Sequence, residues 1–241
     1  MKKFWFILTA LVATCFLVAC SGSQGVSPKT IKEKKKIVVA TESEFAPFEF
    51  KSLVNGKDTL VGADIELAKA IGEKLGVKVE FSVMSFDNVL ANVQSGKADI
   101  AIAGISVTDE RKKVYDFSDS YYTSENVVIV KKDKVNDYTS TDSLAKQTVG
   151  TQKGSVQEIV AKKQITKASV VSLASNGEMI NELKSGQLQA VVLEKAIAEG
   201  YIAQNDDLTL ANFNLKSDGT DAYAVATRKG SDDLLKEINA V

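Results

Sequence analysis

Residues 93–100 read Val-Gln-Ser-Gly-Lys-Ala-Asp-Ile, and residues 183–190 read Leu-Lys-Ser-Gly-Gln-Leu-Gln-Ala. Both stretches are typical of a helix end, a serine-glycine stop and the start of an apolar strand. The ninth residue after each serine is Gly104 in the first copy and Glu194 in the second. Because ligands of open α/β sheets bind at the carboxyl ends of strands, the repeat predicts two α/β lobes facing a shared cleft. A chance likeness of two helix-to-strand turns is the alternative interpretation.

Short β-branched runs alternate with amphipathic segments from residue 37 onward, which predicts an α/β fold with largely parallel sheets. The expected strands are 37–40, 77–83, 100–103, 126–131, 148–150, 169–173, 190–193 and 223–226. Apolar residues spaced by three and four predict one face of a helix over 65–75, which Gly76 is placed to end. Further helices are expected at 88–95, with Asp87 as the cap and Gly96 as the stop, and at 156–162.

Two polar segments predict where the chain passes between the lobes. Residues 131–142 follow an apolar strand, and residues 214–220 precede another. We therefore expect the second lobe to be inserted into the first. The predicted organisation is lobe 1 from 37–125 and 218–241, and lobe 2 from 126–217.

The start of the chain has the pattern of a targeting segment. Lys2 and Lys3 precede an apolar run over 4–19, which is short for a membrane-spanning helix of roughly 20 residues. The run ends in Leu17-Val18-Ala19-Cys20, which resembles a bacterial lipobox. We expect 1–20 to be a lipoprotein signal peptide and Cys20 to carry the lipid anchor. An ordinary signal peptide with an incidental cysteine is the alternative.

The composition excludes several classes of function. The net charge is −1, and without Lys2 and Lys3 there are 28 basic against 31 acidic groups, or −3, so no cationic field points to nucleic acid. The sequence has no histidine and no metal-ligand cluster, and no metal or cofactor is expected. Residues 21–36 are polar and lysine-rich and are expected to form a flexible linker, although these lysines could also attract an anionic membrane.

The stretch Ala103-Gly104-Ile105-Ser106-Val107-Thr108-Asp109-Glu110-Arg111 carries the main functional signal. A glycine lets a ligand approach the backbone closely, and a serine hydroxyl both donates and accepts hydrogen bonds. Arginine offers a rigid fork of donors that suits a carboxylate. Together these residues predict a shelf for a small molecule with a carboxylate and an amine. Alternatively, Arg111 is a surface side chain paired with Asp109 or Glu110.

These residues and several others resemble the polar amino-acid-binding proteins of ABC importers. The motifs that carry the resemblance are Glu42 to Phe50, Val61 to Ala68, Ala103 to Arg111, Asp116-Phe117-Ser118 and Tyr121-Tyr122. The resemblance implies a two-lobed periplasmic-binding-protein-like (type II) α/β fold with a ligand cleft between the lobes and two connecting strands. It also implies a monomer that closes on a free amino acid and delivers it to a membrane permease. Relatives in Gram-positive bacteria are lipoproteins anchored to the outer face of the cell membrane, which fits Cys20.

The resemblance also assigns ligand contacts. Arg111 would bind the α-carboxylate, and Phe45 and Phe86 would sandwich the ligand side chain. Backbone groups and a hydroxyl would come from Ala103, Gly104 and Ser106, and N–H groups at a helix start from Lys153, Gly154 and Ser155. Glu194 stands where relatives usually have an aspartate that holds the α-ammonium. Relatives usually continue beyond Val241 with a C-terminal helix, so the chain is expected to be a truncated product, and Gly150 and Gln152 also depart from the common pattern.

Simpler interpretations exist for some of these residues. Phe45 and Phe86 could be core residues, and Glu42 could be a solvated strand end. The side chain of Lys153 is expected to face solvent, with only its backbone engaged. Glu194 follows an apolar strand, where a carboxylate needs some partner.

The ligand is expected to be arginine or lysine, with glutamine next. Glu42, close to Glu44, stands where the distal end of the ligand lies in relatives, and a carboxylate there favours a cation and repels glutamate. The alternative is an enzyme of the same fold that dehydrates cyclohexadienyl acids, with Glu194 as a general acid. A sensor module for a receptor is a third hypothesis.

Overall fold

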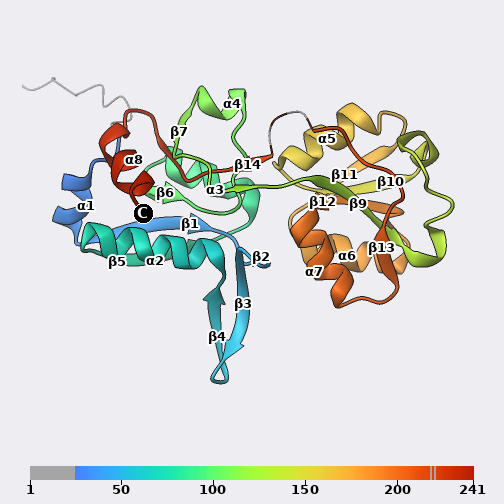
Figure 1. Ribbon diagram of the computed structural model, residues 1–241, viewed down its shortest axis with the longest axis horizontal. Coiled ribbons are helices and arrows are strands. Elements are labelled where there is room, and N and C mark those ends of the chain that lie inside the picture. Colours follow the sequence, from blue (N-terminus) through green and yellow to red (C-terminus); the bar gives the residue numbers. More distant parts are fainter. Residues whose placement is uncertain (1–24, 218, 220) are drawn as a thin grey trace, which may run out of the picture.

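The computed structural model describes residues 25–217, 219 and 221–241, and its described part contains two five-stranded sheets (Figure 1). The first sheet has the order β5-β1-β6-β15-β7, with β5 (Lys78–Val83), β1 (Lys36–Thr41), β6 (Ile100–Ala101), β15 (Ala226–Arg228) and β7 (Tyr115–Phe117). The second has the order β11-β10-β12-β9-β13, with β11 (Ser169–Leu173), β10 (Thr148–Gln152), β12 (Ala190–Glu194), β9 (Asn126–Lys131) and β13 (Leu208–Leu210). The predicted signal peptide 1–20 and Cys20 lie outside the described residues.

The sequence repeat corresponds to a structural repeat. Strands β6 and β12 occupy the same place in their sheets. Strand β6 pairs in parallel with β1, which pairs in parallel with the edge strand β5, and β12 pairs in parallel with β10, which pairs in parallel with the edge strand β11. Helices α3 (Phe86–Gln94) and α6 (Asn176–Ser185) precede them, and Gly96 and Gly186 have φ of 77° and 84°. The sheets are mixed, because β15 and β9 run antiparallel to both of their neighbours, whereas the other four strands of each sheet run in one direction, as expected for largely parallel sheets.

The remaining elements cover the sheets or connect them. The helices are α1 (Pro28–Lys34), α2 (Ala63–Leu75), α4 (Asp109–Lys112), α5 (Val156–Gln164), α7 (Lys195–Ala203), α8 (Asp232–Asn239), and the 3-10 turns η1 (Lys132–Lys134) and η2 (Thr141–Leu144). The short strands are β2 (Glu44–Phe45), β3 (Glu49–Val54), β4 (Lys57–Val61), β8 (Tyr122–Thr123) and β14 (Ala222–Tyr223). Among the described residues, no helix is both long and apolar enough to cross a membrane.

Helix α2 follows the predicted apolar pattern. Its buried face includes Ile65, Ala68, Ile71 and Leu75, and Gly76 ends it in the left-handed conformation at φ 69°. Asp87, in contrast, is not the cap of α3. Ser85 holds the N-cap position, and its hydroxyl donates to the Asp87 carboxylate at 2.6 Å instead of capping the helix.

The predicted flexible linker is wrong for residues 28–34, which form α1. A capping box at Ser27 and Thr30 starts the helix, and Ile31 is fully buried. Ile31 shares its core cluster with Ile71 of α2 and Leu234 of α8, so burial of apolar surface fixes this polar-looking segment to the first lobe.

The first predicted crossing between the lobes is also wrong. Residues 131–142 come after β9, which already belongs to the second sheet, and Leu144 at the end of η2 is buried in the core cluster of that sheet. The two connections run side by side where β8 pairs with β14. There the amide of Asn126 donates to the Asp221 carboxylate at 3.0 Å. The predicted strand 223–226 is divided between β14 and β15.

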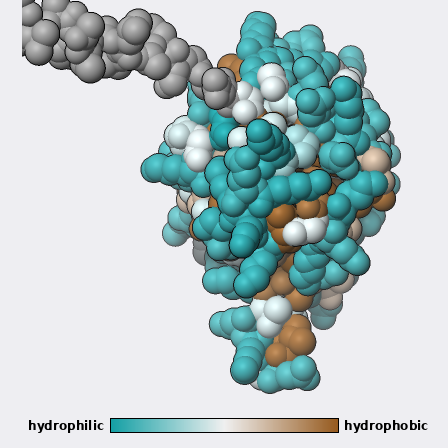
Figure 2. Space-filling view, turned by 90° about the vertical axis from the view of Figure 1, so that its left-hand side faces the viewer, coloured by the Kyte–Doolittle hydropathy of each residue, from teal (hydrophilic) through white to brown (hydrophobic). Residues whose placement is uncertain are grey.

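The β3–β4 hairpin projects from the first lobe, away from both sheets (Figure 1). Figure 2 shows an apolar area near its tip, where Leu53 is 72% exposed. The base of the hairpin has the opposite character, since Glu49 is fully buried. The hairpin thus ends in solvent but begins close to the junction of the lobes.

Candidate functional site

The predicted ligand residues gather where the two lobes meet. From the first lobe come Glu42 after β1, Phe45 in β2, Phe86 at the start of α3, the residues Ala103, Gly104 and Ser106 after β6, and Arg111 in α4. From the second lobe come Lys153, Gly154 and Ser155 between β10 and α5, and Glu194 at the end of β12. Strand carboxyl ends of both sheets thus contribute, as expected for a ligand site in an α/β protein.

Arg111 connects the two lobes. Its guanidinium donates to the carbonyl of Ser106 at 2.7 Å and to the carbonyl of Gly154 at 3.2 Å, and its Cζ lies 5.8 Å from the ring centroid of Phe86. Burial lowers the pKa of Arg111 to about 10, so the guanidinium is charged at neutral pH. In the described part of the chain, no ion pair joins it to a neighbouring carboxylate. Among the described residues, Asp109 pairs with Lys112 instead, at 3.6 Å.

Glu194 is buried at the end of β12. Its Oε1 accepts a hydrogen bond from the side-chain amide of Gln157 at 2.7 Å, and the same amide donates to the Oδ1 of Asn126 at 2.7 Å. Burial raises the pKa of Glu194 to about 7, although Arg111 acts in the opposite direction. The partner that a buried carboxylate needs is therefore supplied in part by Gln157.

Glu42 is buried as well and is not a solvated strand end. Its Oε2 accepts a hydrogen bond from the Gln152 amide at 3.0 Å, and its Oε1 has no partner among the described residues. Burial raises the pKa of Glu42 to about 8, and the charges of Glu194 and Glu44 act in the same direction. A cation placed at Oε1 would supply the missing partner and favour the ionised carboxylate.

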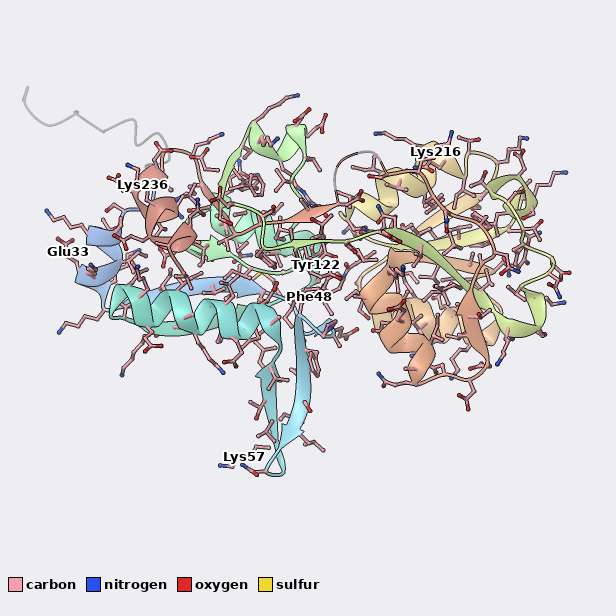
Figure 3. All side chains as sticks on the ribbon, viewed as in Figure 1. Glu33, Phe48, Lys57, Tyr122, Lys216 and Lys236 are labelled. Atoms are coloured by element: carbon pink, nitrogen blue, oxygen red, sulfur yellow. The ribbon has the colours of Figure 1, made fainter. Side chains whose placement is uncertain are left out.

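The aromatic residues form two walls of the site. Phe45 lies against Gly104, where a Cβ atom would be 2.6 Å from the Phe45 ring and φ is +53°. Phe86 lies beneath Arg111. Both rings also belong to core clusters, so their core and site roles coexist. Next to Phe45, the rings of Phe48 and Tyr122 meet edge to face at 4.8 Å (Figure 3).

The second-lobe loop differs from the expectation. The N–H groups of Lys153, Gly154 and Ser155 all donate within the protein, to the Leu173 carbonyl, the Glu158 carboxylate and the Gln152 carbonyl. The first bond extends the β10–β11 ladder, and the other two fold the loop onto the start of α5. The loop therefore contributes the Gly154 carbonyl to Arg111, while its N–H groups are engaged locally.

Three further contacts between the lobes were not anticipated from the sequence. The Lys153 side chain, although 62% exposed, pairs with Asp87 at 2.9 Å. The Gly177 N–H at the start of α6 donates to the Glu44 carboxylate at 3.2 Å, and the Tyr201 hydroxyl donates to the Glu44 carbonyl at 3.3 Å. These contacts join residues far apart in the sequence, so no local pattern could indicate them.

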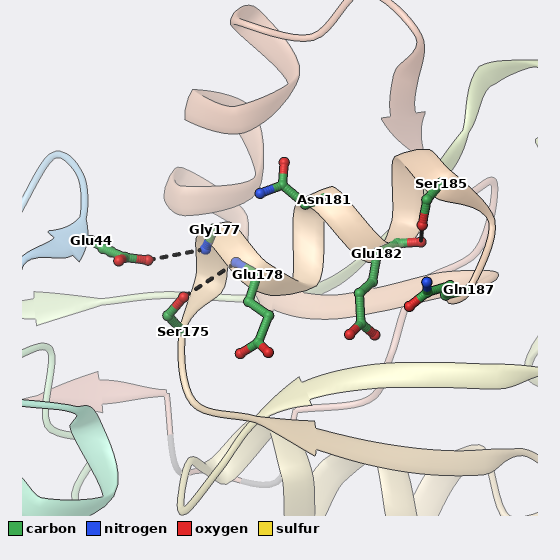
Figure 4. A pocket seen from close by; sticks show the side chains of 8 residues that line it. All are labelled: Glu44, Ser175, Gly177, Glu178, Asn181, Glu182, Ser185 and Gln187. Carbon is green, nitrogen blue, oxygen red and sulfur yellow. Dashed lines mark hydrogen bonds between the residues drawn. The ribbon is translucent and has the colours of Figure 1, made fainter.

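A separate depression of about 580 Å³ lies over α6, next to Glu44 (Figure 4). Its lining residues are Glu44, Ser175, Gly177, Glu178, Asn181, Glu182, Ser185 and Gln187. None of the predicted ligand residues lines it. Within the described residues, no group of three or more potential metal ligands lies together.

The chain is similar in sequence to known proteins. The family of bacterial extracellular solute-binding proteins, family 3, matches residues 37–241. The arginine-binding extracellular protein ArtP of Bacillus subtilis (strain 168) is 36% identical over 210 residues, which cover 86% of this chain and 79% of ArtP. The ABC transporter glutamine-binding protein GlnH of the same organism is 32% identical over 256 residues, which cover 100% of this chain and 91% of GlnH.

Solved structures show the same two-lobed architecture. The amino acid ABC transporter substrate-binding protein AbpA from Streptococcus pneumoniae Canada MDR_19A, bound to L-arginine, has a TM-score of 0.85 and 52% identity, covering 88% of this chain and 89% of that one. Holo ArgBP from T. maritima has a TM-score of 0.81 and 35% identity, and the match covers 88% of this chain and 91% of the ArgBP chain.

Proposed function

Because the chain belongs to family 3 of the bacterial extracellular solute-binding proteins, we propose that it captures L-arginine for an ABC importer, with lysine as a weaker ligand and glutamine next. The observation that carries this choice is the buried carboxylate of Glu42, whose Oε1 has no partner. The arginine-bound structure of a protein 52% identical to this one supports the same ligand.

The charges of the proposed site complement an arginine molecule. Arg111 would pair with the α-carboxylate, Glu194 with the α-ammonium and Glu42 with the guanidinium. When both carboxylates are ionised, these three side chains sum to −1, and arginine carries +1, so the occupied site is neutral. Glutamate would bring a second carboxylate towards Glu42 and would be repelled.

The other predicted residues would shape the site around the ligand. The rings of Phe45 and Phe86 would hold the aliphatic stem or the guanidinium plane. Ala103, Gly104 and Ser106 would offer backbone groups and a hydroxyl near the α-carbon. Lys153, Gly154 and Ser155 would supply the second wall of the site, with Gly154 holding Arg111 in place through its carbonyl.

The mechanism we propose is hinge closure between lobe 1 (37–125 and 218–241) and lobe 2 (126–217). Support comes from bonds that bridge the lobes next to the site, in particular Gln152 to Glu42 and Lys153 to Asp87. The paired connections at Asn126 and Asp221 would act as the hinge. The closed monomer would then dock on the membrane permease, anchored by a lipid at Cys20 to the outer face of the cell membrane of a Gram-positive bacterium.

An enzymatic role has no support from the relatives, which are solute-binding proteins. The test of the proposed function is calorimetric titration of the protein with arginine, lysine, glutamine and glutamate. We expect affinity to fall in that order. Tight binding of glutamate together with no binding of arginine would contradict the assignment of Glu42.

A further inference from the structure

Two carboxyl groups, those of Glu49 and Asp64, are buried within hydrogen-bond reach of each other next to the proposed ligand site. The Asp64 N–H donates to the carbonyl of Phe48, the residue before Glu49, at 2.9 Å. Glu49 in β3 is 0% exposed, and Asp64 in the first turn of α2 is 1% exposed. Among the residues that the structure describes, none donates a hydrogen bond to either oxygen of Glu49 or to the Oδ1 of Asp64. Because an ionised Glu49 without a donor, next to a second buried carboxylate, would be strongly destabilising, at least one proton must be present between the two groups.

The pair lies directly behind two walls of the site. Glu49 is opposite Phe45 in the β2–β3 ladder, and Phe45 in turn lies against Gly104. The Oδ2 of Asp64 accepts the N–H of Gly104 at 3.0 Å and the hydroxyl of Tyr121 at 2.9 Å. Asp64 thus fixes the backbone of the glycine that the ligand would approach.

The surroundings of the two carboxyl groups decide which one keeps the charge. Asp64 has two donors on Oδ2 and lies at the amino end of α2, where the helix dipole favours an anion. Glu49 has neither advantage. Burial raises the pKa of Glu49 well above its usual range, and the neighbouring charges of Asp64, Glu42 and Glu194 act in the same direction.

We propose that Glu49 is a carboxylic acid that donates its proton to the Oδ1 of Asp64, and that this pair positions the Gly104 N–H for ligand binding. The positioning role rests on the proposed function of the site. The location of the proton does not depend on it. Glu49 and Asp64 would act on the site through Phe45 and Gly104, so they are positioning residues and not ligand contacts.

The test compares Glu49→Gln, Glu49→Leu and Asp64→Asn with the parent and with the control Asp58→Asn, an exposed carboxylate on the same hairpin. The first measurement is the infrared carbonyl band of protonated carboxylic acids at neutral pH, which requires no ligand. Glu42→Gln identifies the contribution of Glu42 to that band. The second measurement is the dissociation constant for arginine.

We expect Glu49→Gln to remove one protonated-carboxyl component and to keep the arginine affinity within about threefold, because its amide still donates to Asp64. Glu49→Leu removes the donor and should weaken arginine binding about tenfold or more, as should Asp64→Asn. Asp58→Asn should change neither readout.

If Asp64→Asn alone removes the band and Glu49→Gln retains it, the proton assignment is overturned. If Glu49→Gln weakens binding as much as Glu49→Leu, the positioning role is overturned. If the parent does not bind arginine, the infrared result still decides the proton location, and only the proposed function fails.

Discussion

The amide nitrogen of Gln152 lies 3.0 Å from the Oε2 of Glu42, and this buried hydrogen bond joins the carboxyl ends of β10 and β1 across the two lobes. It satisfies one oxygen of Glu42 and leaves the other without a partner. The bond therefore holds one oxygen of the carboxylate in place, and under the proposed function the other oxygen would accept from the ligand cation. The selectivity of the site should depend on this oxygen.

Replacing Glu42 by glutamine should weaken arginine binding about 30-fold or more, because a buried charge partner contributes at least 2 kcal/mol. The same change should affect glutamine binding much less, since glutamine carries no distal charge. Calorimetric titration with both amino acids measures the ratio. Glu73→Gln, an exposed site on α2, serves as the control. Equal losses for arginine and glutamine would show that Glu42 does not face the distal end of the ligand.

The stability of the ligand-free protein should fall as the pH rises from about 5 to about 8. Glu42 keeps its proton up to a pKa of about 8 in the folded protein, whereas in the unfolded chain it loses the proton near 4.5. The folded state therefore binds more protons in this window, and stability is lost until the pH passes 8. Urea unfolding at pH 5 and pH 8.5 should differ by about 4 kcal/mol from this group. Glu42→Gln should reduce the difference, and an unchanged profile in that variant would contradict the account.

Arginine binding at pH 7 should release about one proton from Glu42 and about half a proton from Glu194. Most Glu42 carboxyl groups are protonated at this pH, and a guanidinium beside them favours the ionised form. Titrations in buffers of different ionisation enthalpy give the number of protons directly. Affinity should rise between pH 6 and pH 8 for the same reason. Proton uptake, or an affinity that falls over this range, would be the opposite of what the geometry predicts.

Alanine at Gly104 should damage both the fold and the site. The residue has φ of +53°, and a Cβ would lie 2.6 Å from the Phe45 ring, so the aromatic wall must move. We expect a loss of about 1–3 kcal/mol in the free energy of unfolding and weaker arginine binding. Gly56→Ala is a matched control, because φ there is +75° but the space around it is open. Equal effects of the two changes would mean that contact with Phe45 is unimportant.

Much of the fold was predictable because its signals are local. The strands 126–131 and 169–173, the helix face ending at Gly76 and the repeat around Ser95 and Ser185 all follow from short patterns. Helix α1 was missed because its stability depends on Ile31 reaching a core that also contains Leu234. The crossing assigned to 131–142 was wrong because a polar composition does not distinguish a connection between lobes from a surface loop within one lobe.

The site was predictable only in part for a related reason. Arg111 and Gly104 belong to one continuous motif, so the shelf could be identified. Gln152 meets Glu42 across 110 positions of sequence, and nothing near either residue indicates the other. The pairing of Glu49 with Asp64 is likewise a product of tertiary packing, which buries two carboxyl groups that the sequence presents as ordinary acidic residues.

In the proposed function, Arg111 holds the α-carboxylate of an arginine ligand. Calorimetric titration of the parent and of Arg111→Ala with L-arginine tests this contact, with Lys112→Ala as an exposed neighbouring control. We expect a dissociation constant in the micromolar range or below for the parent and the control. The affinity of Arg111→Ala should be lower by about 30-fold or more, with an unchanged circular dichroism spectrum. If Arg111→Ala binds arginine as tightly as the parent, Arg111 does not hold the ligand.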